Sequence, residues 1–274
     1  MQHDSVITFI GSGNMASALI GGIVKQGFPA KNIIVAGPEQ AQLDVLQEQM
    51  GVRVTTDNAA AVGEADLVVF AIKPQIFRPV LEDLRAAVEQ SKPLLLSIAA
   101  GITTAAMQDW LGQPAAVVRC MPNTPALVQH GATGMYANDQ VSDAQRQQAQ
   151  SVMDAVGISL WLDSESEIDA VTAVSGSGPA YFFLVMEAME AAAIEMGLTP
   201  DTARKLTQKT ALGAAALASD GSQDPAQLRI NVTSPGGTTE RALQAFEKGG
   251  LRELFSSAME DAKQRSIELA KLDD

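Results

Sequence analysis

The sequence predicts a two-domain protein: an α/β domain built on a mostly parallel sheet with helices on both faces, followed by an all-helical domain. Three observations lead to this prediction. At 274 residues, the chain exceeds the usual size of one domain. Short β-branched runs alternate with helical patterns as far as about Met121, which is the arrangement that gives βαβ units. After Glu165 only helical periodicity is found.

The strands of the first domain are short, and several are apolar throughout, as expected when helices cover both faces of a sheet. They are predicted at Val6–Ile10, Ile33–Ala36, Val52–Thr55, Leu67–Ile72, Leu94–Ile98, Ala116–Arg119, Thr133–Tyr136 and Leu160–Leu162. Helices are predicted between them at Met15–Gln26, Gln40–Met50, Ala60–Glu64, Gln75–Val88, Thr104–Leu111 and Asp143–Val156. We place the boundary near Ser164, which gives domains of residues 1–164 and 165–274.

The helices of the second domain carry little polar surface. The helical pattern breaks at Ser175–Pro179, Gly197–Pro200, Gly221–Pro225 and Ser234–Gly237. Between the breaks, Pro179–Met196 is apolar on most of its circumference and Thr210–Ala218 is nearly all Ala, Leu and Gly. A helix without a broad polar face needs burial on more than one side. A compact monomeric bundle is one solution, but we favour an intertwined homodimer, because so short a domain cannot easily bury that surface by itself.

Charge and composition argue against several classes of partner. The chain has 19 basic and 32 acidic residues, and the resulting net charge of −13 repels phosphate backbones, so no nucleic acid partner is predicted. Cys120 is the single cysteine, which is compatible with a reducing compartment. No secretory pattern is found at the N-terminus, and the apolar stretch Tyr181–Met196 is interrupted by three glutamates. We therefore expect a cytoplasmic protein that does not span a membrane.

A phosphate-binding turn follows the first strand. Val6–Ile10 runs into Gly11-Ser12-Gly13-Asn14-Met15-Ala16, which fits G-x-G-x-x-A between a strand and a helix. Gly11 permits the tight turn, Gly13 lets the backbone approach a pyrophosphate, and Ala16 allows close packing of helix and strand. The pyrophosphate would lie at the helix N-terminus, where free N–H groups favour an anion. The first domain is therefore predicted to be a Rossmann-type dinucleotide-binding domain rather than one with an empty Gly-rich turn.

The end of the second strand should contact the adenosine ribose of the dinucleotide. There Glu39 lies 23 residues after Ala16, close to the spacing of the acidic residue that binds a ribose 2′-hydroxyl in NAD sites. A surface glutamate that starts the next helix is an equally good interpretation. No Arg or Lys lies between Ala36 and Gly51 to hold a 2′-phosphate. The cofactor is predicted as NAD(H) or NADP(H), with the choice open.

Further loops are candidates for ligand contacts. Ala71–Pro74 and Ala99–Gly101 follow the fourth and fifth strands, and ligands of open α/β sheets bind outside such strand ends. There, Lys73 either neutralises a phosphate or is an ordinary solvated lysine.

In the helical domain, Ser234–Thr239 precedes an amphipathic helix and offers a cluster of N–H groups suited to a carboxylate. A plain interhelical loop with a threonine cap is the alternative. Ser175–Tyr181 is a second tight break, where small residues let a backbone or a nicotinamide ring approach, or where the chain simply turns.

The chain resembles one enzyme family over essentially its whole length, and three stretches carry this resemblance. They are Pro225-x-x-Leu228-x-x-x-Val232-Thr233-Ser234-Pro235-Gly236-Gly237-x-Thr239-x-x-Ala242-Leu243-x-x-Phe246-Glu247, Arg119–Pro125, and Asp169–Tyr181. In these blocks the chain resembles the Δ1-pyrroline-5-carboxylate reductases. The resemblance implies reduction of a cyclic imine carboxylate to L-proline by NADPH or NADH, the last step of proline biosynthesis.

The resemblance also implies roles for individual residues. Gly237, Thr238 and Thr239 match the loop whose amides hold the substrate carboxylate, and Thr239 matches the catalytic threonine whose hydroxyl meets the ring nitrogen. Glu165 matches a substrate-side glutamate. Cofactor contacts are implied at Ile10, Gly11, Ser12, Gly13, Asn14, Met15, Ala36, Asn58, Ala71, Ile72, Lys73, Pro74, Ile98, Ala99, Ala100 and Asn231. At Ala36-Gly37 the chain departs from relatives that place Ser or Arg there for a 2′-phosphate. The family further implies a homodimer through the helical domain, with a decamer of five dimers as a larger assembly.

The residues that the chain lacks agree with imine reduction. An imine nitrogen enters already protonated, so hydride transfer needs no strong protein acid and depends on positioning. Only His3 and His130 are present, so no metal site and no nucleophile–histidine pair are predicted. A β-hydroxyacid dehydrogenase would need a lysine on the helix after the Gly-rich break, where Tyr181–Met186 has none. A non-catalytic nucleotide-sensing dimer would have no need of the carboxylate loop.

Overall fold

The computed structural model describes residues 4–272, so His3 lies outside the described part of the chain. The described residues divide into two compact units. The first unit contains the chain up to Ser177 together with the segment from Ala262 onwards, and the second runs from Gly178 to Asp261. These units are defined by packing, and the boundary at residues 164 and 165 stays a prediction about domains.

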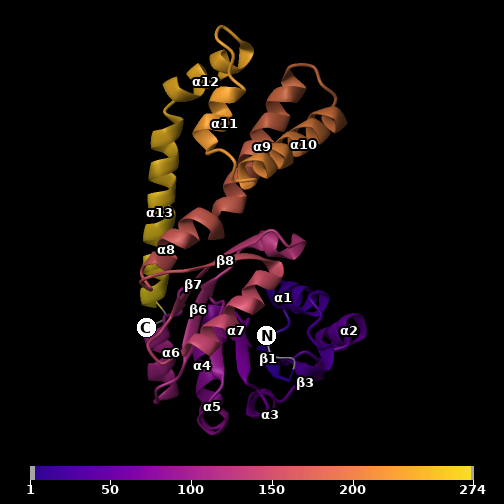
Figure 1. Ribbon diagram of the computed structural model, residues 1–274, viewed down its shortest axis with the longest axis vertical. Coiled ribbons are helices and arrows are strands. Elements are labelled where there is room, and N and C mark those ends of the chain that lie inside the picture. The colour runs from indigo at the N-terminus through magenta and orange to yellow at the C-terminus, as the bar shows by residue number, and fades with distance from the viewer. Residues whose placement is uncertain (1–3, 273–274) are drawn as a thin grey trace. The chain divides into compact units, whose positions relative to one another are not determined.

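The first unit is built on one sheet of eight strands, in the order β3-β2-β1-β4-β5-β6-β7-β8 (Figure 1). The strands are β1 (Ile7–Ile10), β2 (Ile33–Ala36), β3 (Arg53–Thr55), β4 (Leu67–Phe70), β5 (Leu94–Ser97), β6 (Val117–Met121), β7 (Gly131–Ala137) and β8 (Gly157–Trp161). All neighbours are parallel except β6 and β7. The predicted α/β class with a mostly parallel sheet is confirmed, and every predicted strand overlaps an observed one.

Helices cover both faces of this sheet, which explains the continuous apolar strands. Residues of β4 alternate between two cores: Leu67 and Val69 belong to one, and Val68 and Phe70 to the other. The first core is closed by α1 (Asn14–Lys25), α2 (Gln40–Met50) and α7 (Asp143–Met153). The second is closed by α3 (Asn58–Gly63), α4 (Phe77–Asp83), α5 (Arg85–Ser91) and α6 (Thr104–Leu111).

One predicted helix is divided. Gln75–Val88 was expected as a single helix, but the chain forms a 3-10 turn (Pro74–Ile76), α4 and α5 instead. Leu84 separates the two helices with φ −92° and ψ 0°, values outside the regular α-helical range. The second helix, α5, begins at Arg85, whose Nε donates to the carbonyl oxygen of Trp110 at 2.6 Å. This tertiary contact is invisible in the local periodicity.

A predicted break is helical instead. Ser175–Pro179 was expected to interrupt the chain, yet helical residues run from Glu167 to Glu195 through α8 (Glu167–Val171), a π-helical turn (Thr172–Gly176) and α9 (Gly178–Glu195). The wider turn is closed by the amide of Ser177, which donates to the carbonyl of Thr172 at 2.8 Å. Pro179 then lies in the first turn of α9, where no amide hydrogen is required.

This helical run is longer than the apolar stretch that the sequence predicted, Tyr181–Met196. The run has 29 residues, and its most apolar 18-residue window has a mean hydropathy of 1.2, so it is long and apolar enough to cross a bilayer by those two criteria alone, which the interrupted pattern had not suggested. Only 17% of its most apolar window is buried in the single chain. The core helix of a soluble protein can meet the same criteria, so they do not by themselves identify a membrane span.

The second unit is all-helical and leaves large apolar side chains uncovered. It contains α9, α10 (Pro200–Ser219), α11 (Pro225–Asn231), α12 (Thr238–Lys248) and the first part of α13 (Leu251–Leu272). Within this unit α9 and α10 lie side by side (Figure 1), joined by an ion pair of 3.7 Å between Glu190 and Arg204. On α9, Phe182 and Phe183 remain 68% and 62% exposed. Such contiguous apolar surface indicates an interaction face.

Candidate active site

The Gly-rich turn after β1 has the geometry that a bound pyrophosphate requires. Gly11 has φ +107°, and a Cβ there would lie 2.4 Å from the carbonyl oxygen of Ala71, so only glycine fits. Gly13 is the N-cap of α1 without a side-chain cap bond, and nothing lies within 4 Å of where its Cβ would be. The N-terminus of α1 therefore has no side chain that would block an anion there, and the anion site itself stays a prediction.

The strand ends bring the predicted nucleotide residues together at one edge of the sheet. The amide of Gly11 donates to Ala36 at 2.8 Å, and the amide of Ala71 donates to Ile10 at 2.9 Å. The amide of Ile98 donates in turn to Phe70 at 3.2 Å. Because β2, β1, β4 and β5 are consecutive in the sheet, the segments Ile10–Met15, Ala71–Pro74 and Ile98–Ala100 share its carboxyl edge. Lys73 in the second segment is exposed.

Asn58 has a buried polar atom without a partner in the described part of the chain. It begins α3, beside Asp57, whose carboxylate caps that helix by accepting from the amide of Ala60 at 2.9 Å. The side-chain oxygen Oδ1 of Asn58 is buried and has no hydrogen-bond donor among the described residues. A buried acceptor left unpaired costs about 1–3 kcal/mol, so a ligand hydroxyl is expected at this position. The open turn and this acceptor together fit a dinucleotide.

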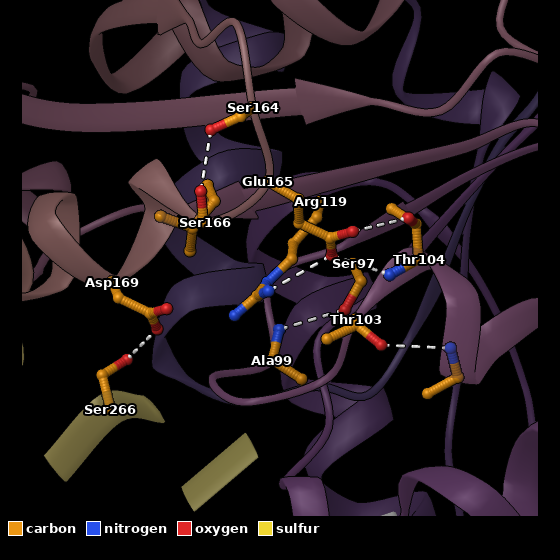
Figure 2. A network of polar contacts seen from close by, with 12 residues as sticks. Ser97, Ala99, Thr103, Thr104, Arg119, Ser164, Glu165, Ser166, Asp169 and Ser266 are labelled. Atoms are coloured by element: carbon orange, nitrogen blue, oxygen red, sulfur yellow. Dashed lines mark hydrogen bonds and ion pairs between the residues drawn. The ribbon is translucent and has the colours of Figure 1, made fainter. Parts of the chain in front are cut away.

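Glu165 lies at the centre of a partly buried polar network in the first unit (Figure 2). Its Oε1 accepts from the amide of Thr104 at 2.8 Å and from Nη1 of Arg119 at 3.2 Å. Its Oε2 accepts from the hydroxyl of Thr104 at 2.8 Å. The Arg119 side chain is 5% exposed and that of Glu165 21%. These contacts join β6, the first turn of α6 and the loop after β8.

This network changes the interpretation of Glu165. A cavity of about 300 Å³ adjoins it, lined by Thr103, Arg119, Glu165, Ser166, Asp169, Ile267 and Ala270. Both carboxylate oxygens already accept bonds from the protein, so Glu165 holds its loop in place whatever else it contacts. Nearby, the hydroxyl of Ser266 on α13 donates to Asp169 at 2.7 Å (Figure 2).

Thr104 and Arg119 were not predicted as partners of Glu165. A signal for Arg119 was present, because a charged residue inside the apolar strand Val117–Met121 has to be paired when it is buried. Thr104 offered no such signal. Cys120, which follows Arg119 in β6, is buried. This burial raises the pKa of its thiol, so Cys120 stays protonated.

The predicted carboxylate loop forms a compact turn in the second unit. The amide of Gly237 donates to the carbonyl of Ser234 at 3.0 Å, and Gly236 has φ +72°. The amide of Gly236 donates to the carboxylate of Glu240 at 2.8 Å. Gly237 is the N-cap of α12 and provides no side-chain cap, so the N–H groups of the first turn stay available for an anion.

Three predicted residues of the second unit differ in their surroundings. Thr238 is exposed, and Thr239 is half-buried, both in the first turn of α12. Asn231, at the end of α11, is held by two other side chains: its Nδ2 donates to Gln223 at 2.6 Å, and its Oδ1 accepts from Gln227 at 2.8 Å. These bonds fix the side-chain orientation of Asn231.

Comparison with known proteins identifies the family. Residues 165–269 match the family described as pyrroline-5-carboxylate reductase dimerisation, and residues 6–101 match the family described as NADP oxidoreductase coenzyme F420-dependent. A pyrroline-5-carboxylate reductase of Pseudomonas aeruginosa is 52% identical over 265 residues, which cover 97% of each chain.

Two solved structures agree with this assignment. A pyrroline-5-carboxylate reductase from Coxiella burnetii is 46% identical, with a TM-score of 0.94 and coverage of 97% of this chain and 98% of that one. The pyrroline carboxylate reductase of Plasmodium falciparum, solved with NADP bound, is 27% identical, with a TM-score of 0.86 and coverage of 98% and 100%. The resemblance seen in the sequence is confirmed: the chain belongs to the pyrroline-5-carboxylate reductase family, the NAD(P)H-dependent oxidoreductases that reduce Δ1-pyrroline-5-carboxylate to proline.

Proposed function

We propose that the chain reduces Δ1-pyrroline-5-carboxylate to L-proline with the residue roles predicted above. The nucleotide is held in the first unit by Ile10–Met15, Ala36, Asn58, Ala71–Pro74 and Ile98–Ala100. The resemblance to the family also assigns Asn231, which lies in the second unit, to the nucleotide. The observations that support this best are the open turn at Gly11 and Gly13 and, separately, the unpaired Oδ1 of Asn58. The bound nucleotide supplies a hydride to the imine carbon of the substrate.

The substrate carboxylate is assigned to the loop before α12. The N–H groups of Thr238 and Thr239 meet the negative charge, which the N-terminal end of a helix also favours, while Gly237, the third residue predicted there, bonds through its own amide to Ser234. The hydroxyl of Thr239 then accepts a hydrogen bond from the protonated ring nitrogen and orients the imine. Because the nitrogen arrives protonated, the enzyme acts mainly by positioning two bound molecules.

Glu165 has a supporting role in this proposal. Its bonds to Thr104 and Arg119 hold the loop after β8 against the first turn of α6. α6 begins at Thr104, four residues after Ala100 in the segment Ile98–Ala100 that is assigned to the nucleotide. Any contact of Glu165 with substrate would come in addition to these three bonds.

The proposal is tested with purified protein, pyrroline-5-carboxylate and either NADH or NADPH in parallel assays. Oxidation of at least one nucleotide, with L-proline formed in equal amount, is the expected result. Absence of turnover with both nucleotides, in protein that is folded by circular dichroism, would contradict the proposed function. We place the reaction in the cytoplasm, where a single free cysteine is stable.

The assembly that we propose is a homodimer through the helical residues of the second unit, with a decamer of five dimers as the larger form. The exposed apolar side chains of α9 support it, because a monomer in water would leave them uncovered. The Phe183→Glu variant is expected to lose the dimer, since burying an unpaired carboxylate at the interface costs several kcal/mol. Size-exclusion chromatography with light scattering measures the mass directly.

The matched control adds the same charge elsewhere. Gln147 is an exposed polar residue on α7 in the first unit, and Gln147→Glu should keep the mass of the native assembly. A native protein that is monomeric and fully active would refute the dimer.

A further inference from the structure

The adenosine end of the nucleotide site is bounded by the segment after β2. Here the amide of Gly37 donates to the carbonyl of Thr55 at 3.3 Å, while Ala36 accepts from Gly11. These bonds fix the segment between β3 and the Gly-rich turn. A Cβ on Gly37 would lie 3.9 Å from the hydroxyl oxygen of Ser12, so the segment and the turn are in direct proximity.

A chain of three side chains connects Glu39 to the Gly-rich turn. The hydroxyl of Ser12 donates to Oε1 of Gln42 at 3.1 Å, and Nε2 of Gln42 donates to the carboxylate of Glu39. Glu39 is the N-cap residue of α2, yet its side chain makes no capping bond to that helix. The carboxylate is therefore held beside the turn by Gln42 and is not explained by helix capping.

Positive charge is scarce in the same region. Between Gly37 and Asn58 the sequence contains one basic residue, Arg53, and its Nη2 donates to both carboxylate oxygens of Glu64 at 2.9 and 2.8 Å. Lys73 follows β4, which is separated from β2 by β1 in the sheet. A phosphate on the ribose 2′ position would thus meet the carboxylate of Glu39, whereas a 2′-hydroxyl could donate to it.

We propose that Glu39, positioned by Gln42, makes this reductase select NADH over NADPH. The inference rests on the nucleotide site proposed above and assigns its specificity. A phosphate carries about −1.5 to −2 charges, and the repulsion between two unit charges at 4 Å in bulk water is about 1 kcal/mol, which corresponds to about a fivefold change in Kd. Adding the lost hydrogen bond, we expect NADH to bind at least about tenfold more tightly than NADPH.

Isothermal titration of the full-length protein with NADH and with NADPH measures the two Kd values directly, without turnover. In Glu39→Gln the charge is lost while the shape is kept, so the Kd for NADPH should fall about tenfold. The ratio of the Kd for NADPH to the Kd for NADH should then approach one. Raising the salt concentration should narrow the ratio in the native protein, because salt screens the repulsion, and should leave it unchanged in the variant.

Glu48→Gln is the matched control. Glu48 is exposed on the same helix, nine residues further along, or roughly 13 Å by the helical rise of about 1.5 Å per residue, so its charge is largely screened. Its ratio of Kd values should equal that of the native protein. Gln42→Met, which releases Glu39, should weaken the preference without abolishing it.

Equal or tighter binding of NADPH by the native protein, or an unchanged ratio in Glu39→Gln, would overturn the inference about specificity while leaving the proposed function intact. Binding of neither nucleotide would refute the nucleotide site itself, and this inference with it.

Discussion

Thr239→Val is expected to lower kcat/KM for pyrroline-5-carboxylate by a factor on the order of 100, with the nucleotide Kd unchanged. Removal of one aligned hydrogen-bonding group at a reacting centre costs about 10²–10³ in rate. Valine keeps the shape of threonine and removes only the hydroxyl. Since Thr239 is half-buried in the first turn of α12, the replacement should leave the loop intact. Steady-state kinetics and a nucleotide titration measure the two quantities.

Two further variants identify the hydroxyl as the cause. Thr239→Ser keeps a hydroxyl and should restore most of the activity. Thr238→Val, at the exposed neighbour, keeps the backbone amide and should have an effect of less than about tenfold. If Thr239→Val retained native kcat/KM, the assignment of Thr239 to the reacting nitrogen would be wrong.

Arg119→Met is expected to reduce the free energy of unfolding by about 3–5 kcal/mol, the usual cost of removing one member of a buried ion pair. The Arg119 side chain is 5% exposed, and its loss leaves the carboxylate of Glu165 with Thr104 as its partner. Urea denaturation followed by circular dichroism measures the change. Nucleotide affinity should also fall, since Glu165, the partner of Arg119, bonds to Thr104 at the start of α6, four residues after Ala100.

The surface pair of Arg78 and Glu82 provides the control. Their side chains are 55% and 34% exposed at a distance of 3.3 Å, so Arg78→Met should cost less than about 1 kcal/mol. The double variant Arg119→Met with Glu165→Leu removes both charges and should be more stable than Arg119→Met alone. If Arg119→Met and Arg78→Met cost the same, the network around Glu165 would not be a structural link.

The local sequence pattern was enough to predict most of the helices and strands of the first unit. The strands are runs of apolar residues with both faces covered, and the Gly-rich turn is recognised because its glycines stand between such a strand and a helix. The errors occurred where long-range contacts decide the local conformation. Arg85 restarts a helix by bonding to Trp110, and a π-helical turn around Thr172 lets the chain continue past Pro179.

The candidate site shows the same division. The sequence by itself determined which residues are predicted to carry the chemistry, because glycine, threonine and acidic residues at particular spacings are recognisable along one chain. Only the tertiary structure decided what these residues contact: Glu165 bonds to Thr104 and Arg119, which lie 61 and 46 positions away, and Glu39 is linked through Gln42 to Ser12. Such pairings depend on the order of the strands and on which buried charge needs a partner, and neither is encoded in local periodicity.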